Sequence, residues 1–141
     1  MGGYNSQMNS LETLFWALSD PTRLRILHFL SNGELCVGDL VELLNVPQPK
    51  VSRHLNHLRE AGLVNVRRSG LWAFYSREEE MDQSSLILLN ALDQCWELEP
   101  EYVRDHKKAF RLMKKGGCCP ELDLETRADL LSGKNRRSKP A

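Results

Sequence analysis

The sequence predicts a mostly α-helical fold with a β-hairpin, in the order α-α-α-α-β-β-α, plus an extra C-terminal helix. Three observations predict it. Apolar residues recur at helical spacing over residues 10–58, the period changes to two over residues 63–77, and helical spacing returns from residue 83. The chain has 141 residues, of which 41% are hydrophobic and 27% charged, so it has room for one such domain and a short extension.

Four helices are expected before the hairpin. Asp20 is a good N-cap and Pro21 suits the first position of a helix, so a helix begins there. Asn45–Pro47 separates two later helices by a break of the length found in helix-turn-helix units, and Gly62 is a typical C-terminal glycine. The four helices are expected over Ser10–Leu18, Pro21–Asn32, Val37–Leu44 and Gln48–Gly62.

A β-hairpin is expected over residues 63–77. Valines alternate with polar residues from Val64, Ser69-Gly70 supplies the turn, and Leu71–Tyr75 returns. Together with the two helices before it, this hairpin predicts a winged helix-turn-helix. Two further helices are expected over Gln83–Glu97, with Asp82 as its N-cap, and over Pro100–Lys115.

The helix expected over residues 83–97 is apolar around most of its circumference. A helix with that pattern is buried on most of its sides. We expect the first helix to cover one side and a second copy of the chain to cover another, which predicts a homodimer through the first and fifth helices. The apolar residues are Leu86, Ile87, Leu88, Leu89, Ala91, Leu92, Cys95 and Trp96.

Charge is unevenly distributed along the chain. The formal net charge is zero, but residues 48–77 hold six basic side chains and one acidic one, while residues 78–101 hold eight acidic side chains and no basic one. A local basic block binds phosphates whatever the average over the chain. The chain has no run of about 18 apolar residues and no signal-peptide pattern, which predicts a cytoplasmic protein with no membrane partner.

The fourth helix carries the side chains expected to read DNA. Its buried stripe is formed by Val51, Leu55 and Leu58, and its opposite side is polar. Arginine binds guanine and asparagine binds adenine in the major groove, while lysine suits a phosphate. His54 lies at the edge of the buried stripe and is expected to be structural. The candidate DNA-binding residues are Gln48, Lys50, Ser52, Arg53, Asn56 and His57 on this helix and Arg67 and Arg68 on the hairpin.

Arg67 and Arg68 place two positive charges side by side on the ascending strand of the hairpin. Arginines on such a wing enter the minor groove or contact the flanking phosphates. The aromatic residues Trp72, Phe74 and Tyr75 are expected to pack the hairpin onto the domain rather than stack on bases. We therefore expect the wing to supply affinity for phosphates.

Three segments, Ser19–Leu27, Glu34–Leu40 and Val51–Val64, resemble the ArsR/SmtB family of metal- and metalloid-responsive repressors. The resemblance covers about residues 10–97. It implies a homodimer that binds its operator and leaves it when an inducer binds. The expected organisation is a DNA-binding and dimerisation domain over residues 1–98, a helix with a cysteine-containing extension over 99–133, and a disordered basic tail over 134–141.

Both of the family's usual inducer sites are incomplete in this chain. The arsenic-type site needs two cysteines at the start of the third helix, and the chain has Cys36 but Gly38 where the second would stand. The zinc-type site on the fifth helix needs an aspartate with several histidines, and no histidine lies between Asp82 and Glu97. An inducer site in this chain would therefore be a relocated one.

The remaining cysteines predict where such an inducer binds. Cys118 and Cys119 are adjacent and follow two glycines, and Cys95 lies at the end of the fifth helix. Trivalent arsenic and antimony are soft and take three thiolates, so the expected inducer is As(III), methylarsenite or Sb(III), with no permanent cofactor. Whether Cys95 or Cys36 completes the site, and from which subunit, stays open.

Two alternatives stay open at this point. The first keeps the repressor and makes the thiols a redox or persulfide switch, using Cys36 with Cys95 or with the adjacent pair. The second is a thiol enzyme, which is disfavoured because the chain has no Cys-x-x-Cys motif, no glycine-rich phosphate loop and no acid–base cluster. Cys36 and Cys95 also fit the role of small hydrophobic residues in the core.

Overall fold

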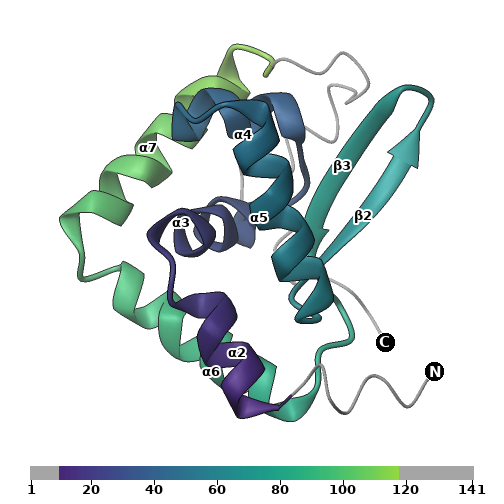
Figure 1. The fold of residues 1–141 in the computed structure, drawn as a ribbon. Helices are drawn as coiled ribbons and strands as arrows, with labels where there is room; N and C mark the ends of the chain where they lie inside the picture. The colour runs from purple at the N-terminus through teal and green to yellow at the C-terminus, as the bar shows by residue number, and fades with distance from the viewer. Residues whose placement is uncertain (1–9, 118–141) are drawn as a thin grey trace.

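The computed structural model of the protein describes residues 10–117. Figure 1 shows the hairpin of β2 and β3 beside α5, with α7 on the other side of the molecule and both α2 and α6 at one end. This arrangement confirms the predicted winged helix-turn-helix with an extra C-terminal helix. The elements are α2 (Leu11–Leu18), α3 (Pro21–Phe29), a 3-10 turn (Leu30–Asn32), β1 (Leu35–Cys36), α4 (Val37–Leu44), α5 (Gln48–Glu60), β2 (Val64–Ser69), β3 (Trp72–Arg77), α6 (Gln83–Trp96) and α7 (Pro100–Lys114).

Side-chain caps set where two of the helices begin. The Oδ1 atom of Asp20 accepts hydrogen bonds from the backbone N–H groups of Thr22 at 2.8 Å and Arg23 at 3.1 Å. In the same way Asp82 accepts a hydrogen bond of 2.9 Å from the N–H group of Ser85. The first N–H groups of a helix lack partners within it, so an acidic side chain at the N-cap stabilises its start. Both expected N-caps are confirmed.

The sheet contains a third strand that the sequence analysis missed. The strand order is β1-β3-β2, and both pairings are antiparallel. Leu35 and Cys36 of β1 pair with Tyr75 and Phe74 of β3. A strand of two residues is too short to show an alternating pattern, and it forms here because β3 offers it a free edge. Cys36 therefore lies at the junction of the sheet and α4.

The turn of the hairpin lies one residue later than predicted. Ser69 still belongs to β2 and pairs with Trp72 of β3, so Gly70 and Leu71 form the connection. Gly70 has a φ angle of 60°, a left-handed conformation that glycine adopts at low cost. The side chain of Leu71 is fully exposed. The wing therefore ends in an apolar tip that projects from the body of the molecule (Figure 1).

The core lies where α3, α4, α5 and the sheet meet. Ile26, Leu40 and Leu55 contribute one fully buried side chain from each helix, and Phe74 is fully buried on β3. Tyr75 is buried as well. The hairpin aromatics thus pack the wing onto the domain, as expected, and the shared core fixes the wing relative to α5.

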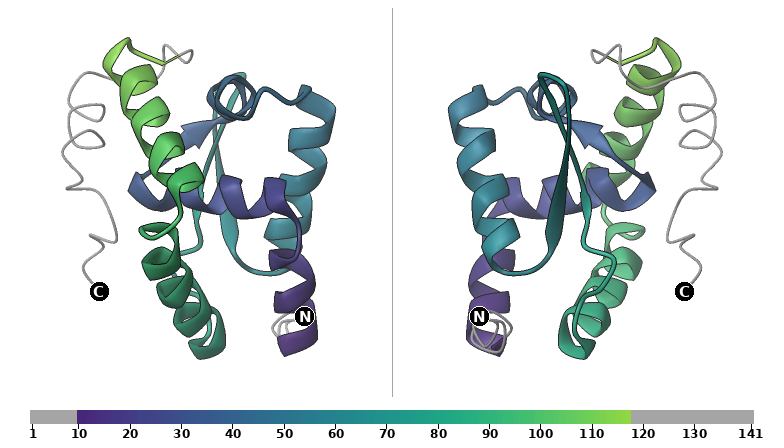
Figure 2. Two further views of the ribbon diagram at one scale, coloured as in Figure 1. Left: turned by 90° about the vertical axis from the view of Figure 1, so that its left-hand side faces the viewer. Right: turned by 90° about the vertical axis from the view of Figure 1, so that its right-hand side faces the viewer.

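Over residues 10–117, α2 and α6 each carry large apolar side chains that stay exposed. Figure 2 shows both helices extending from the same end of the molecule, with space between them. The expected packing of the first helix on α6 within one chain is not seen over residues 10–117. At its C-terminal end α6 leads into α7, and Trp96 of α6 packs against Tyr102 of α7 at 5.5 Å between ring centroids. The side chains left between 43% and 57% exposed are Leu11, Phe15 and Trp16 on α2 and Leu86 and Ile87 on α6.

The C-terminal helix α7 packs across α3 and α4. Its buried Asp105 accepts hydrogen bonds of 2.8 and 2.9 Å from the guanidinium of Arg25 on α3. The Nζ atom of Lys108 donates a hydrogen bond of 2.7 Å to the carbonyl oxygen of Leu43 on α4. Two polar contacts therefore hold α7 against α3 and α4, the two helices that precede α5.

Candidate DNA interface and cysteine site

The exposed side of α5 carries most of the predicted DNA-binding residues. Val51, Leu55 and Leu58 are fully buried and hold the other side of the helix against the core. This anchoring leaves polar side chains in positions from which they can enter a groove of DNA. Gln48, Lys50, Arg53 and Asn56 are exposed on α5, and Ser52 is half-buried beside them.

Arg59 adds a positive charge to this side of α5 and was not predicted. Its guanidinium donates a hydrogen bond of 3.4 Å to the side-chain oxygen of Asn56. The two residues are three apart, a spacing at which helix side chains are neighbours, and this spacing was the signal in the sequence. Arg59 therefore orients the amide that is expected to pair with adenine.

His57 faces α2 rather than open solvent. Its ring lies edge-on to Trp16 at 4.9 Å between centroids, and its Nδ1 atom lies 3.4 Å from the guanidinium of Arg23. The buried His54 contacts the same guanidinium at 3.2 Å, which bears out the expected structural role, and burial lowers the pKa of His54. This packing favours a structural role for His57 over the DNA contact that the sequence predicts.

The two wing arginines have different surroundings. The guanidinium of Arg67 lies 4.6 Å from the ring of Phe74 and donates hydrogen bonds of 2.9 and 2.8 Å to the carboxylate of Glu34. These hydrogen bonds raise the pKa of Arg67. Arg68 pairs with Ala73 in the register, is exposed, and faces the other side of the sheet. A phosphate contact by Arg67 therefore competes with an ion pair inside the protein.

The cysteines occupy distinct parts of the fold. Cys36 is buried and disulfide-bonded, and its Sγ atom accepts a hydrogen bond of 3.4 Å from the backbone N–H group of Asp39 in α4. Cys95 is a free, exposed thiol at the end of α6. Cys118 and Cys119 lie outside the described residues. Over residues 10–117, no three His, Cys, Asp or Glu side chains gather as a metal site.

The helix α7 lies between Cys95 and Gly117, the last residue of the described chain. The helix has 15 residues, which corresponds to about 22 Å at 1.5 Å per residue. Cys95 precedes the start of α7, whereas the described chain ends at Gly117, just after the end of α7. Cys95 and the end of the described chain therefore lie toward opposite ends of α7.

Comparison with known proteins decides the family. A family model described as "Bacterial regulatory protein, arsR family" matches residues 20–66. The arsenic resistance transcriptional regulator ArsR1 of Pseudomonas putida is 37% identical over 107 residues, which cover 73% of this chain and 83% of that protein. The chain belongs to the ArsR family.

Other members agree with this assignment. The arsenical resistance operon repressor of Escherichia coli is 42% identical over 92 residues, covering 64% of this chain and 76% of its own. The solved structure of HlyU from Vibrio cholerae is 32% identical, with a TM-score of 0.55, over 64% of this chain and 94% of that one. The Pseudomonas putida and Escherichia coli relatives are named as a regulator and a repressor, which confirms a DNA-binding transcriptional regulator and not an enzyme. Within residues 10–117, no helix has the length and apolar character to cross a membrane.

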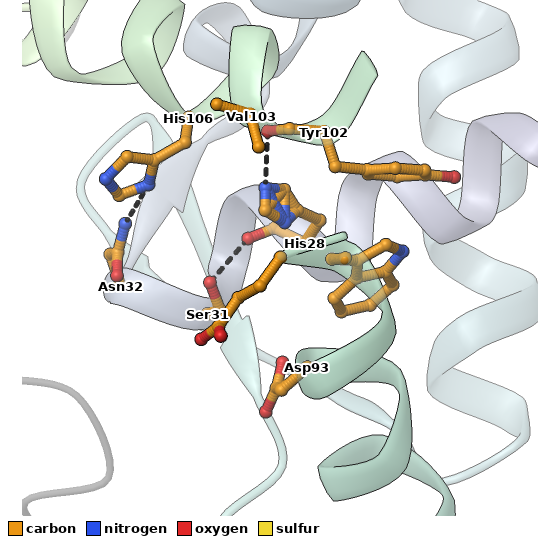
Figure 3. A pocket seen from close by; sticks show the side chains of 9 residues that line it. His28, Ser31, Asn32, Asp93, Tyr102, Val103 and His106 are labelled. Atoms are coloured by element: carbon orange, nitrogen blue, oxygen red, sulfur yellow. Dashed lines mark hydrogen bonds between the residues drawn. The ribbon is translucent and has the colours of Figure 1, made fainter. Parts of the chain in front are cut away.

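A cavity of about 390 Å³ lies in this ArsR-family regulator between the end of α3, the end of α6 and the start of α7 (Figure 3). The Nε2 atom of His28 lies 3.0 Å from the carbonyl oxygen of Tyr102, and burial lowers the pKa of His28 to about 4. Ser31 donates to the carbonyl oxygen of His28 at 2.6 Å, and Asn32 contacts His106 at 3.3 Å. The contacts of His28 and Asn32 join this end of α3 to α7, whereas the Nδ1 atom of His28 is buried and has no hydrogen-bond partner among the described residues.

Proposed function

We propose that this ArsR-family regulator is a cytoplasmic, homodimeric repressor that releases operator DNA when its thiolates bind a soft metalloid. The proposed inducer is As(III), methylarsenite or Sb(III). The observation that carries the DNA-binding part is the exposed polar side of α5, where Arg53 and Asn56 stand beside a wing that carries Arg68. The relatives named for arsenic or arsenical resistance support the inducer class.

Arg53 is the proposed contact to a guanine base. Replacing it by alanine should weaken binding to the operator by about 1–3 kcal/mol and relax the preference at one base pair, with little change on random DNA. Arg104→Ala is the matched control, because Arg104 is an exposed arginine on α7. Fluorescence anisotropy with both DNA types measures the two losses. Equal losses on operator and random DNA would reassign Arg53 to a phosphate.

The proposed dimer buries the apolar faces of α2 and α6. Phe15 and Ile87 are each 57% exposed in the single chain, and they lie on the two helices that leave the same end of the molecule. Large apolar side chains exposed on two helices at one end of a molecule are typical of a protein interface. A twofold contact between these faces would set the spacing of the two copies of α5, which must match the spacing of the operator half-sites.

The proposed inducer site contains Cys118 and Cys119 and a third thiolate. Cys95 precedes α7 and the described chain ends just after it, so in this proposal Cys95 completes the site from the second subunit. Cys36 offers the alternative third ligand only after its disulfide is reduced, since it lies at the start of α4, a helix against which α7 packs. An inducer displaces a repressor only by binding its DNA-free form more tightly, so losing one ligand of three should remove most of the response.

Serine variants at the four cysteines test this site. Cys118→Ser and Cys119→Ser should bind operator normally but stay bound when arsenite is added. A mixed dimer that combines Cys95→Ser in one subunit with the double variant of the pair in the other restores one site only if Cys95 acts across the interface. If the double variant responds to arsenite like the wild type while Cys36→Ser does not, the proposed pair is wrong.

The redox or persulfide switch is the second candidate function. The observation that favours it is the disulfide at Cys36, which lies at the N-cap of the first helix of the helix-turn-helix. Titration with arsenite and with a persulfide donor separates the two functions. Near-ultraviolet absorption from thiolate bound to metalloid should rise only with arsenite, and DNA release by the persulfide alone would support the redox switch.

A further inference from the structure

A buried arginine joins the last turn of α2 to the rest of the molecule. Arg23 of α3 is only 6% exposed. Its Nε atom donates a hydrogen bond of 2.7 Å to the carbonyl oxygen of Ala17, and its guanidinium donates another of 2.9 Å to that of Trp16. The last carbonyl groups of a helix lack partners within it, so these two hydrogen bonds hold the end of α2.

The same guanidinium also reaches the recognition helix. One terminal nitrogen of Arg23 lies 3.2 Å from Nδ1 of His54 and 3.4 Å from Nδ1 of His57, both on α5. Arginine has only donors, so each histidine nitrogen must accept, and each ring carries its proton on Nε2. The Nε2 atom of His54 lies 3.9 Å from the carboxylate of Asp20, the N-cap of α3. Arg23 of α3 therefore holds the orientation of both histidine rings, and Asp20 also contacts His54.

Trp16 of α2 closes this cluster. The guanidinium of Arg23 lies 4.6 Å from the centre of the Trp16 ring, and His57 meets the same ring edge-on at 4.9 Å. A cation over an aromatic face and an edge-on ring pair both restrict orientation as well as add contact. The cluster thus fixes α2, α3 and α5 relative to one another at a single point.

We infer that Arg23 is a positioning residue for DNA recognition, which sets the orientation of α5 relative to α2. The inference rests on the proposed function, in which α5 reads DNA and α2 forms part of the dimer interface. His54 and His57 are the immediate neighbours of Arg53 and Asn56 in the sequence, so holding the two rings also aims the two base-reading side chains. A lysine keeps the charge of Arg23 but lacks the planar fork that serves four acceptors at once.

Arg23→Lys tests the inference against a matched control on the same helix. Arg25→Lys makes the same chemical change at a residue that binds Asp105 of α7 instead of α5. The DNA is a duplex that the wild-type protein selects from a random pool, together with a scrambled duplex of equal length. Circular dichroism and sedimentation confirm that each variant is folded and in the wild-type oligomeric state.

Arg23→Lys should lose about tenfold or more in affinity for the selected duplex and less than about twofold for the scrambled one. Arg25→Lys should stay within about twofold of the wild type on both. Loss of specificity with retained affinity for random DNA is the sign of a misaimed recognition helix, because phosphate contacts do not depend on which base is read. A folded Arg23→Lys variant that keeps wild-type specificity, or that loses both affinities equally, overturns the inference.

His54 supplies a second test if Arg23→Lys does not fold. His54→Gln keeps an acceptor for Arg23, whereas His54→Leu removes it. The leucine variant should lose specificity and the glutamine variant should recover most of it; equal specificity in the two variants would contradict the inference. If the wild type selects no sequence from the pool, the proposed function itself fails. If the wild type selects a duplex that the variants bind as well, only the role of Arg23 fails.

Discussion

Lys108 of α7 donates a hydrogen bond of 2.7 Å to the carbonyl oxygen of Leu43 in the last turn of α4. That carbonyl group lies at the negative end of the α4 dipole, where an ammonium group is favourable. The contact joins the extra C-terminal helix directly to the first helix of the helix-turn-helix. A displacement of α7 would therefore act on the last turn of α4 through this hydrogen bond as well as through their packing.

Lys108→Met should lower the free energy of unfolding by about 1–2 kcal/mol, because it removes a charged donor from the end of α4 while keeping the aliphatic chain. Urea unfolding measures the change. Lys107→Met is the control, since Lys107 is exposed on the same helix, and it should stay within about 0.5 kcal/mol of the wild type. Equal effects of the two variants would show that the contact with Leu43 contributes nothing to stability.

Arg68→Ala should weaken binding to operator and to random DNA together, and it should reduce the slope of log affinity against log salt by about one. Arg67→Ala should change that slope less, because the guanidinium of Arg67 is already paired with Glu34. Titrations at several salt concentrations give both slopes. A larger change in slope for Arg67→Ala would mean that the ion pair opens when DNA binds.

Ile87→Glu and Phe15→Glu should each dissociate the proposed dimer, because a charge in an apolar twofold contact meets its own copy without a partner. Both side chains are 57% exposed in the single chain, so the variants should keep their helical content. Leu71→Glu at the wing tip is the control and should stay dimeric. Sedimentation velocity measures the oligomeric state. If all three variants dimerise with the affinity of the wild type, the interface lies elsewhere.

The free energy of unfolding should rise with pH between about 4 and 6.5 because of His28. Burial lowers its pKa from 6.5 to about 4, and Arg77 and His106 act in the same direction while Asp105 and Asp93 oppose them. The unfolded chain binds the proton more tightly in this window, so acid favours unfolding by up to about 3 kcal/mol. Urea unfolding of the wild type and of His28→Gln at pH 4.5 and 6.5 tests this, and identical pH dependence in the two proteins would exclude His28 as the cause.

Local signals in the sequence predict the helices and caps well. Asp20 and Asp82 accept hydrogen bonds as N-caps where expected, and α4 covers Val37–Leu44 as predicted. Each of these features depends on residues within one turn of one another. The strand β1 was missed because it has two residues and exists only through its pairing with β3, about 40 residues later.

Long-range partners explain where the candidate site departs from the predictions. The helical spacing of α5 places His57 on its outer side, but Arg23, 34 residues earlier, and Trp16 draw the ring toward α2. The sequence predicts that Arg67 is free to contact DNA, but the fold places Glu34 beside it as a hydrogen-bond acceptor. Arg23, Trp16 and Glu34 are not visible as partners in a pattern confined to one element, because such patterns report only neighbours along the chain.

Cys36 occupies the N-cap of α4, where its sulfur accepts a hydrogen bond from the backbone N–H group of Asp39. A thiolate at this position would accept that hydrogen bond strongly and would suit the positive end of the helix dipole, whereas a sulfur in a disulfide carries no charge and accepts weakly. Reduction of the disulfide at Cys36, followed by loss of the thiol proton, would therefore strengthen the hydrogen bond that holds the first turn of α4. The oxidation state of Cys36 would in this way contribute to the stability of the helix-turn-helix.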